Sequence, residues 1–102
     1  MPLGMVELAR AREAAQAILE TLQLDGYLFE VEPAESGWRV RIECAIPGGW
    51  ATVEIEVDAD TLVDSRNDGA LRQQLVEAWR PRLAHCKVSP QADLKGGART
   101  PD

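Results

Sequence analysis

The sequence predicts an α+β fold of two layers in the order αβββα, with a three-stranded antiparallel meander and both helices packed on one face of the sheet. Three observations support this fold class. The stretch 27–57 contains three runs that alternate apolar and polar residues, which is typical of strands with one buried face. Turn-forming residues separate these runs. Segments with helical periodicity lie on both sides of the stretch.

The N-terminal segment 3–24 is predicted to be a helix. Its apolar residues recur at three- and four-residue steps and so lie on one stripe, made of Leu8, Ala11, Ala15, Ile18, Leu19 and Leu22. The run 9–17 is rich in alanine, a strong helix former. Asp25-Gly26 should end the helix, with Gly26 as the left-handed cap residue.

The alternation in the stretch 27–57 divides its side chains between two faces of the predicted sheet. The inward set is Phe29, Val31, Trp38, Val40, Ile42, Cys44, Val53, Ile55 and Val57. The outward set is charged and consists of Glu30, Glu32, Arg39, Arg41, Glu43, Glu54 and Glu56. Burying one large apolar side chain is worth about 1.5–3 kcal/mol, so we expect the helices to cover the inward face. We expect the outward face to be solvated and rich in ion pairs.

Trp50 has the parity of the outward set, unless the glycines beside it introduce a bulge. An exposed tryptophan at that position could anchor a partner protein. In the alternative interpretation, it folds over Pro47 and the aliphatic part of Arg41.

The connector 58–68 is polar except for Leu62 and Val63, which should close one end of the core or form a short helical turn. A second helix should begin near residue 67 or 68, where Asp68 can bond free backbone N–H groups. Its predicted buried stripe is Leu71, Leu75, Ala78 and Trp79. Pro81 should end or kink this helix, or open a last short turn.

Length and composition predict a single domain over residues 1–87 and a disordered tail over 88–102. The net charge is −6, and residues 27–57 contribute −4 of it, with six acidic residues and two arginines. We expect no secretory signal and no membrane span. Cys44 and Cys86 do not suggest a disulfide framework, which indicates a reducing cytoplasm.

Residues for catalysis are scarce in this chain. His85 is the only histidine, and neither a nucleophile elbow nor a phosphate loop accompanies it. One histidine and two distant cysteines make a poor metal site. We therefore predict no enzyme activity, no cofactor and no metal. The less favoured alternative is a thiol enzyme that uses His85 and Cys86.

The element order resembles that of double-stranded RNA-binding domains over roughly residues 5–85. That resemblance would imply a nucleic-acid-binding module, which we keep as the alternative function. The family carries lysines at the start of its second helix and a Gly-Pro-x-His type of loop between its first two strands. Here residues 67–72 read Asn-Asp-Gly-Ala-Leu-Arg, and residues 33–37 read Pro-Ala-Glu-Ser-Gly. Since an acidic sheet also repels phosphate, nucleic acid is the less favoured partner.

The leading hypothesis is therefore a small acidic protein without catalytic activity that binds another protein, as an adaptor or a chaperone. The predicted partner-binding residues are Trp50, Arg39 and Arg41. A homodimer formed through a sheet edge is left open. The identity of the partner does not follow from the sequence.

Overall fold

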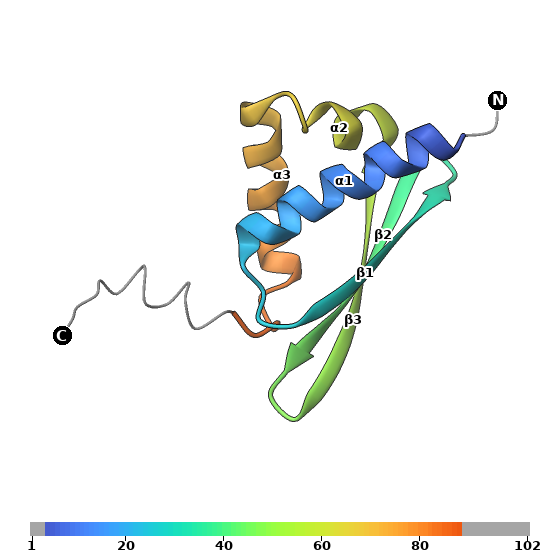
Figure 1. The fold of residues 1–102 in the computed structure, drawn as a ribbon. Helices are drawn as coiled ribbons and strands as arrows, with labels where there is room; N and C mark the ends of the chain where they lie inside the picture. The colour runs from blue at the N-terminus through green and yellow to red at the C-terminus, as the bar shows by residue number, and fades with distance from the viewer. Residues whose placement is uncertain (1–3, 89–102) are drawn as a thin grey trace.

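The computed structural model describes residues 4–88 and confirms the α+β prediction (Figure 1). The elements follow in the order α1 (Met5–Leu22), β1 (Tyr27–Ala34), β2 (Gly37–Ile46), β3 (Gly49–Asp58), α2 (Ala59–Asp64) and α3 (Gly69–Arg82). The strands form one antiparallel sheet in the order β1-β2-β3. In Figure 1 the three helices lie on one side of this sheet. The short helix α2 contains Leu62, which is fully buried, as the sequence suggested.

Helix α1 buries the face that its apolar stripe predicted. Its buried residues are Ala11, Ala14, Ala15, Ile18, Leu19 and Leu22. At the C-terminus, however, the left-handed residue is Gln23, with φ 57° and ψ 47°, and not Gly26 as predicted. The chain must turn this early because Leu24 lies in the core and pairs with Val88. A helix that continued to residue 24 would carry Leu24 away from that position.

The two faces of the sheet are as predicted, and the strands pair without a bulge. Val31 on β1 lies opposite Val40 on β2, which in turn lies opposite Ile55 on β3, and all three are buried. The β1–β2 connection is the two-residue turn 35–36, and the β2–β3 connection is Pro47-Gly48. Gly48 has a φ of 87°, which glycine adopts without steric cost. Both tight turns hold the strands in this one register.

The core lies between β2 and the helices. Trp38, Val40 and Ile42 of β2 are almost completely inaccessible to solvent. Helix α1 packs against β1, α2 packs against β2 and β3, and α3 packs against α1 and α2. Because β1 and β3 are edge strands, inward residues such as Phe29 and Val53 are only half-buried.

Helix α3 begins as predicted, with the Asp68 carboxylate accepting a hydrogen bond from the Leu71 N–H at 3.1 Å. Its buried stripe differs, because Val76 and Trp79 are buried whereas Ala78 is exposed. The stripe is rotated because α3 packs chiefly against the other helices rather than flat on the sheet.

The end of α3 also differs from one of the sequence expectations. Pro81 does not stop the helix, which continues to Arg82. Beyond it, Val88 belongs to the packed structure through its pairing with Leu24, although the predicted tail began there. The rest of that predicted tail, 89–102, lies outside the described residues.

Gly37 begins β2 at a point of very close backbone approach. A Cβ atom there would overlap the carbonyl oxygen of Val57 and would lie 2.9 Å from the backbone nitrogen of Ala59. We therefore expect Gly37→Ala to lower the free energy of unfolding by about 2 kcal/mol or more, because the backbone itself must move. Gly49→Ala is the matched control, since nothing lies within 4 Å of its Cβ position. Equal denaturant midpoints for the two variants would contradict this assignment.

Tyr27, the only tyrosine of the chain, allows a test by pH. Burial, and secondarily the negative charge of Glu20, raise the pKa of its phenol above the ordinary value of 10.0. The contribution of Tyr27 to the free energy of unfolding should therefore be fully present below about pH 10. It should be lost as the pH rises through the pKa of the folded state. Absorbance of the phenolate should report a higher midpoint in the folded protein than in denaturant. Tyr27→Phe should lack the alkaline loss of stability that this group causes.

Candidate functional site

The outer face of the sheet has no helix against it and carries the predicted site residues. Its side chains form cross-strand rows, because directly opposed residues point to the same face. One row is Glu30–Arg41–Glu54, and the next is Glu32–Arg39–Glu56. Over the whole outer face, five glutamates, Asp58 and two arginines give a net charge of −4.

Each arginine lies between glutamates of both neighbouring strands. Arg39 contacts Glu56 at 3.1 Å and Glu32 at 3.5 Å. Arg41 contacts three carboxylates, those of Glu30 at 3.1 Å and of Glu32 and Glu54 at 3.3 Å each. Glu32 links the two rows because it forms ion pairs with both arginines. The predicted ion-paired surface is thus confirmed, as one connected network of six side chains.

The network also raises the pKa of its two arginines. A hydrogen bond to Glu56, with the charge of that carboxylate, raises the pKa of Arg39. A hydrogen bond to Glu54 and the charge of Glu32 raise the pKa of Arg41. Both guanidinium groups carry a positive charge, as arginine does throughout the ordinary pH range. With their donors directed at the glutamates, they hold the acidic surface in place rather than presenting a free cationic site.

Trp50 lies on the same outer face, and 62% of its surface is exposed. It is opposite Ala45, and its Cη2 atom is 3.9 Å from the position that a Cβ on Gly26 would occupy. The indole therefore reaches across β2 toward the start of β1. Two residues beyond Gly26 on that face is Leu28, which is 66% exposed. Together these residues form an apolar patch beside the charged rows, which we call the Trp50 patch: Gly26, Leu28, Ala45 and Trp50.

The structure brings only two of the three predicted site residues together. Arg39 and Arg41 belong to adjacent rows, whereas the row Leu28–Glu43–Thr52 lies between them and Trp50. Trp50 does not fold back over Arg41 but extends toward Gly26. Leu28 is not among the site residues predicted from the sequence. Its parity with Glu30 and Glu32 was the signal that could have identified it.

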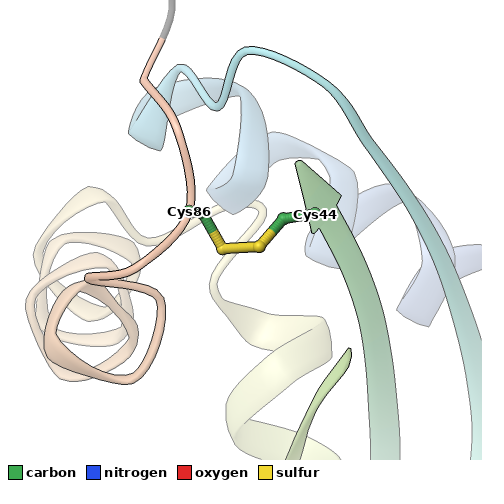
Figure 2. Close-up of a disulfide and its surroundings, with 2 residues drawn as sticks. All are labelled: Cys44 and Cys86. Atoms are coloured by element: carbon green, nitrogen blue, oxygen red, sulfur yellow. A yellow bond between two sulfur atoms is a disulfide. The ribbon is translucent and has the colours of Figure 1, made fainter. Parts of the chain in front are cut away.

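The cysteines were interpreted wrongly. Cys44 and Cys86 form a disulfide, with their Cα atoms 5.5 Å apart (Figure 2). The bond joins the end of β2 to the segment after α3 and is buried. A buried, bonded Cys86 has no free thiol, so the thiol-enzyme alternative lacks its nucleophile in this structure. His85 is exposed.

Backbone hydrogen bonds hold the segment next to the disulfide. The Lys87 N–H donates to the Ala45 carbonyl at 2.8 Å, and the Asp25 N–H donates to the Lys87 carbonyl at 2.7 Å. The segment 86–88 therefore extends the ladder between the start of β1 and the end of β2. Nothing local in the sequence indicates this pairing, since the partners are distant along the chain.

A groove of about 440 Å³ lies beside this segment, where the ends of α1 and α3 meet. Its lining is mainly apolar: Leu22, Leu24, Pro81, Leu83, Ala84, Cys86 and Val88, with Glu77 and Arg80 also contributing. No group of three or more potential metal ligands lies together within residues 4–88. Within the same residues, no helix is long and apolar enough to cross a membrane.

Comparisons with known proteins found no matching family model, no matching curated protein and no matching solved structure.

The disulfide should contribute strongly to stability, because it closes a loop between residues 42 positions apart. Loop-closure entropy alone gives about 4 kcal/mol for a loop of this size. We expect reduction to lower the free energy of unfolding by roughly that amount. The measurement is urea denaturation with and without reductant, combined with thiol labelling of the unfolded protein. A Cys44→Ala/Cys86→Ala variant is the control and should not respond to reductant. Full labelling without reductant would contradict the pairing.

Proposed function

We propose that this chain is a small non-catalytic protein-binding domain, adaptor-like or chaperone-like, which uses the outer face of its sheet. The observation that carries the proposal is the exposure of Trp50 and Leu28 on one uncovered face. Large aromatic residues dominate the energy of protein interfaces when a partner buries them. A solvent-exposed sheet face does not require a tryptophan for folding, so the position of Trp50 on this face favours a binding role.

Beside the Trp50 patch, the ion-paired rows supply the specificity of the proposed interface. Arg39 and Arg41 hold four glutamates in fixed cross-strand positions, which leaves a preorganised acidic surface. Charge complementarity of this kind selects partners and accelerates association more than it adds affinity. A partner with a basic surface and an apolar anchor would suit both parts.

The outer face of the sheet does not support the alternative function, nucleic-acid binding. RNA binding would require a cationic surface, whereas this face has a net charge of −4. The guanidinium of Arg72, in the first turn of α3, is already engaged within the protein. It donates to the backbone carbonyls of Ser65 and Arg66, at 3.1 and 3.3 Å. The prediction of a cytoplasmic location depended on two cysteines without a disulfide. The bond between Cys44 and Cys86 removes that basis.

The proposal predicts a strong effect of Trp50→Ala on binding and a small effect on folding. Partners captured on the immobilised wild-type protein would be identified by mass spectrometry, purified and titrated against each variant. Trp50→Ala should weaken binding at least about thirtyfold, as expected for an interface anchor. It should change the free energy of unfolding by only about 0.5 kcal/mol. Thr52→Ala, an exposed neighbour on the same strand and face, is the control and should bind nearly normally. Equal affinity of the Trp50→Ala variant and the wild type would refute the proposal.

A further inference from the structure

The free edge of β3 presents backbone groups that the sheet does not use. Ala45 directs its N–H to Gly26 and its carbonyl to Lys87, both on the β1 side of β2. Trp50, which is opposite Ala45, therefore points its own N–H and carbonyl away from β2, because antiparallel pairs alternate between bonded and non-bonded positions. The same holds at every second residue, which gives the edge positions Trp50, Thr52, Glu54 and Glu56.

A hydrogen bond from α3 confirms this direction independently. The Arg82 Nη2 atom donates to the Glu54 carbonyl at 2.7 Å, so that carbonyl faces the edge and not β2. Within residues 4–88, this is the one side-chain hydrogen bond to the backbone of the four edge positions. The edge is therefore open apart from one long, flexible side chain.

The opposite edge of the sheet, on β1, is a poorer template. On β1 the backbone groups that point away from β2 belong to every second residue, and Pro33 is one of these residues. Proline has no N–H to donate to an added strand. An added strand would therefore pair better with β3.

The side chains along β3 determine which strand would fit. On the outer face it would meet Trp50, Thr52, Glu54 and Glu56, which are exposed and acidic on balance. On the inner face it would meet the half-buried side chains of Ala51, Val53 and Val57 at the margin of the core. A strand that alternates basic and apolar residues would satisfy both faces at once.

A second copy of the chain fits this edge less well. In an antiparallel β3–β3 pair centred on residue 54, Glu54 lies opposite Glu54 of the other copy, and in a pair centred on residue 55 it lies opposite Glu56. Like charges opposed in this way are destabilising. The charge of the edge therefore favours a foreign basic strand over self-association.

We propose that the β3 edge binds an extended segment of a partner protein, with alternating basic and apolar residues, as a fourth strand of the sheet. This inference rests on the proposed function and specifies how the partner is held. Backbone hydrogen bonds to Thr52, Glu54 and Glu56 supply the pairing, the carboxylates of Glu54 and Glu56 select the basic side chains, and Trp50 covers one end. The partner strand displaces Arg82 from the Glu54 carbonyl.

The test uses the full chain and a synthetic octapeptide with blocked ends that alternates lysine and valine. Binding is measured by calorimetry, and amide hydrogen exchange by NMR identifies the strand that pairs. We expect slower exchange at the edge amides of Thr52, Glu54 and Glu56, and none of this protection from a peptide of the same composition with lysines and valines in two blocks. Phe29 and Val31 on β1 serve as the internal comparison.

Two variants separate edge pairing from a general charge effect. Thr52→Pro removes an N–H that faces the edge but no hydrogen bond to β2, so the fold should persist and binding should weaken roughly tenfold. Arg82→Ala frees the Glu54 carbonyl and should tighten binding several-fold. Circular dichroism and denaturant unfolding would confirm that both variants are folded.

Three results would overturn the inference: no binding of the alternating peptide at millimolar concentration, protection at β1 instead of β3, or unchanged affinity in Thr52→Pro. The proposed function is distinguished by the Trp50→Ala titration against the captured partner. If that titration shows the expected loss while Thr52→Pro binds the same partner normally, the outer face binds protein and the strand-addition mode is wrong.

Discussion

The register of the three strands is the constraint on which the rest of this structure depends. Side chains alternate between faces along a strand, so a shift of one residue would move every core residue of that strand to the solvent. In the observed register, Val31, Val40 and Ile55 meet across the buried face, while Arg41 lies between Glu30 and Glu54 on the other. Burial, ion pairing and the two short turns therefore all favour the same alignment.

That register also determines what each surface of the molecule can do. The helices cover the apolar face and leave the acidic face, with Trp50 at one end, open to solvent. Because hydrogen-bonded positions alternate along the strands, the register further decides which backbone groups of β3 point to the free edge. The proposed binding surface and the proposed mode of binding are thus two consequences of one alignment.

The end of the domain is held by a different set of interactions. The disulfide between Cys44 and Cys86, together with the hydrogen bonds of Lys87, attaches the segment after α3 to the start of β1 and the end of β2. In a chain of this size the hydrophobic core alone gives a modest margin of stability. A covalent link between distant segments adds to that margin by restricting the unfolded chain. It also forms part of the apolar groove beside α3.

Several features could be predicted from the sequence because short-range patterns encode them. The period-two alternation in 27–57 predicted the strands and their faces, and parity alone placed Trp50 outside. The alanine-rich stripe predicted α1, and Asp68 predicted the start of α3. The errors have a common cause. The predictions for Gly26, Ala78 and Cys86 were wrong because the environments of these residues depend on segments that are distant in the sequence.

Sequence patterns alone therefore specify the local structure: the strands and their two faces, the helical stripes and the turns. Three-dimensional packing determines which distant parts of the chain meet. It paired Cys44 with Cys86, rotated the buried face of α3 toward α1, ended α1 at a left-handed Gln23 and brought Arg82 to the edge of β3. The physical reason is that alternation and helical periodicity act between near neighbours in the chain, whereas these contacts arise from how whole elements pack.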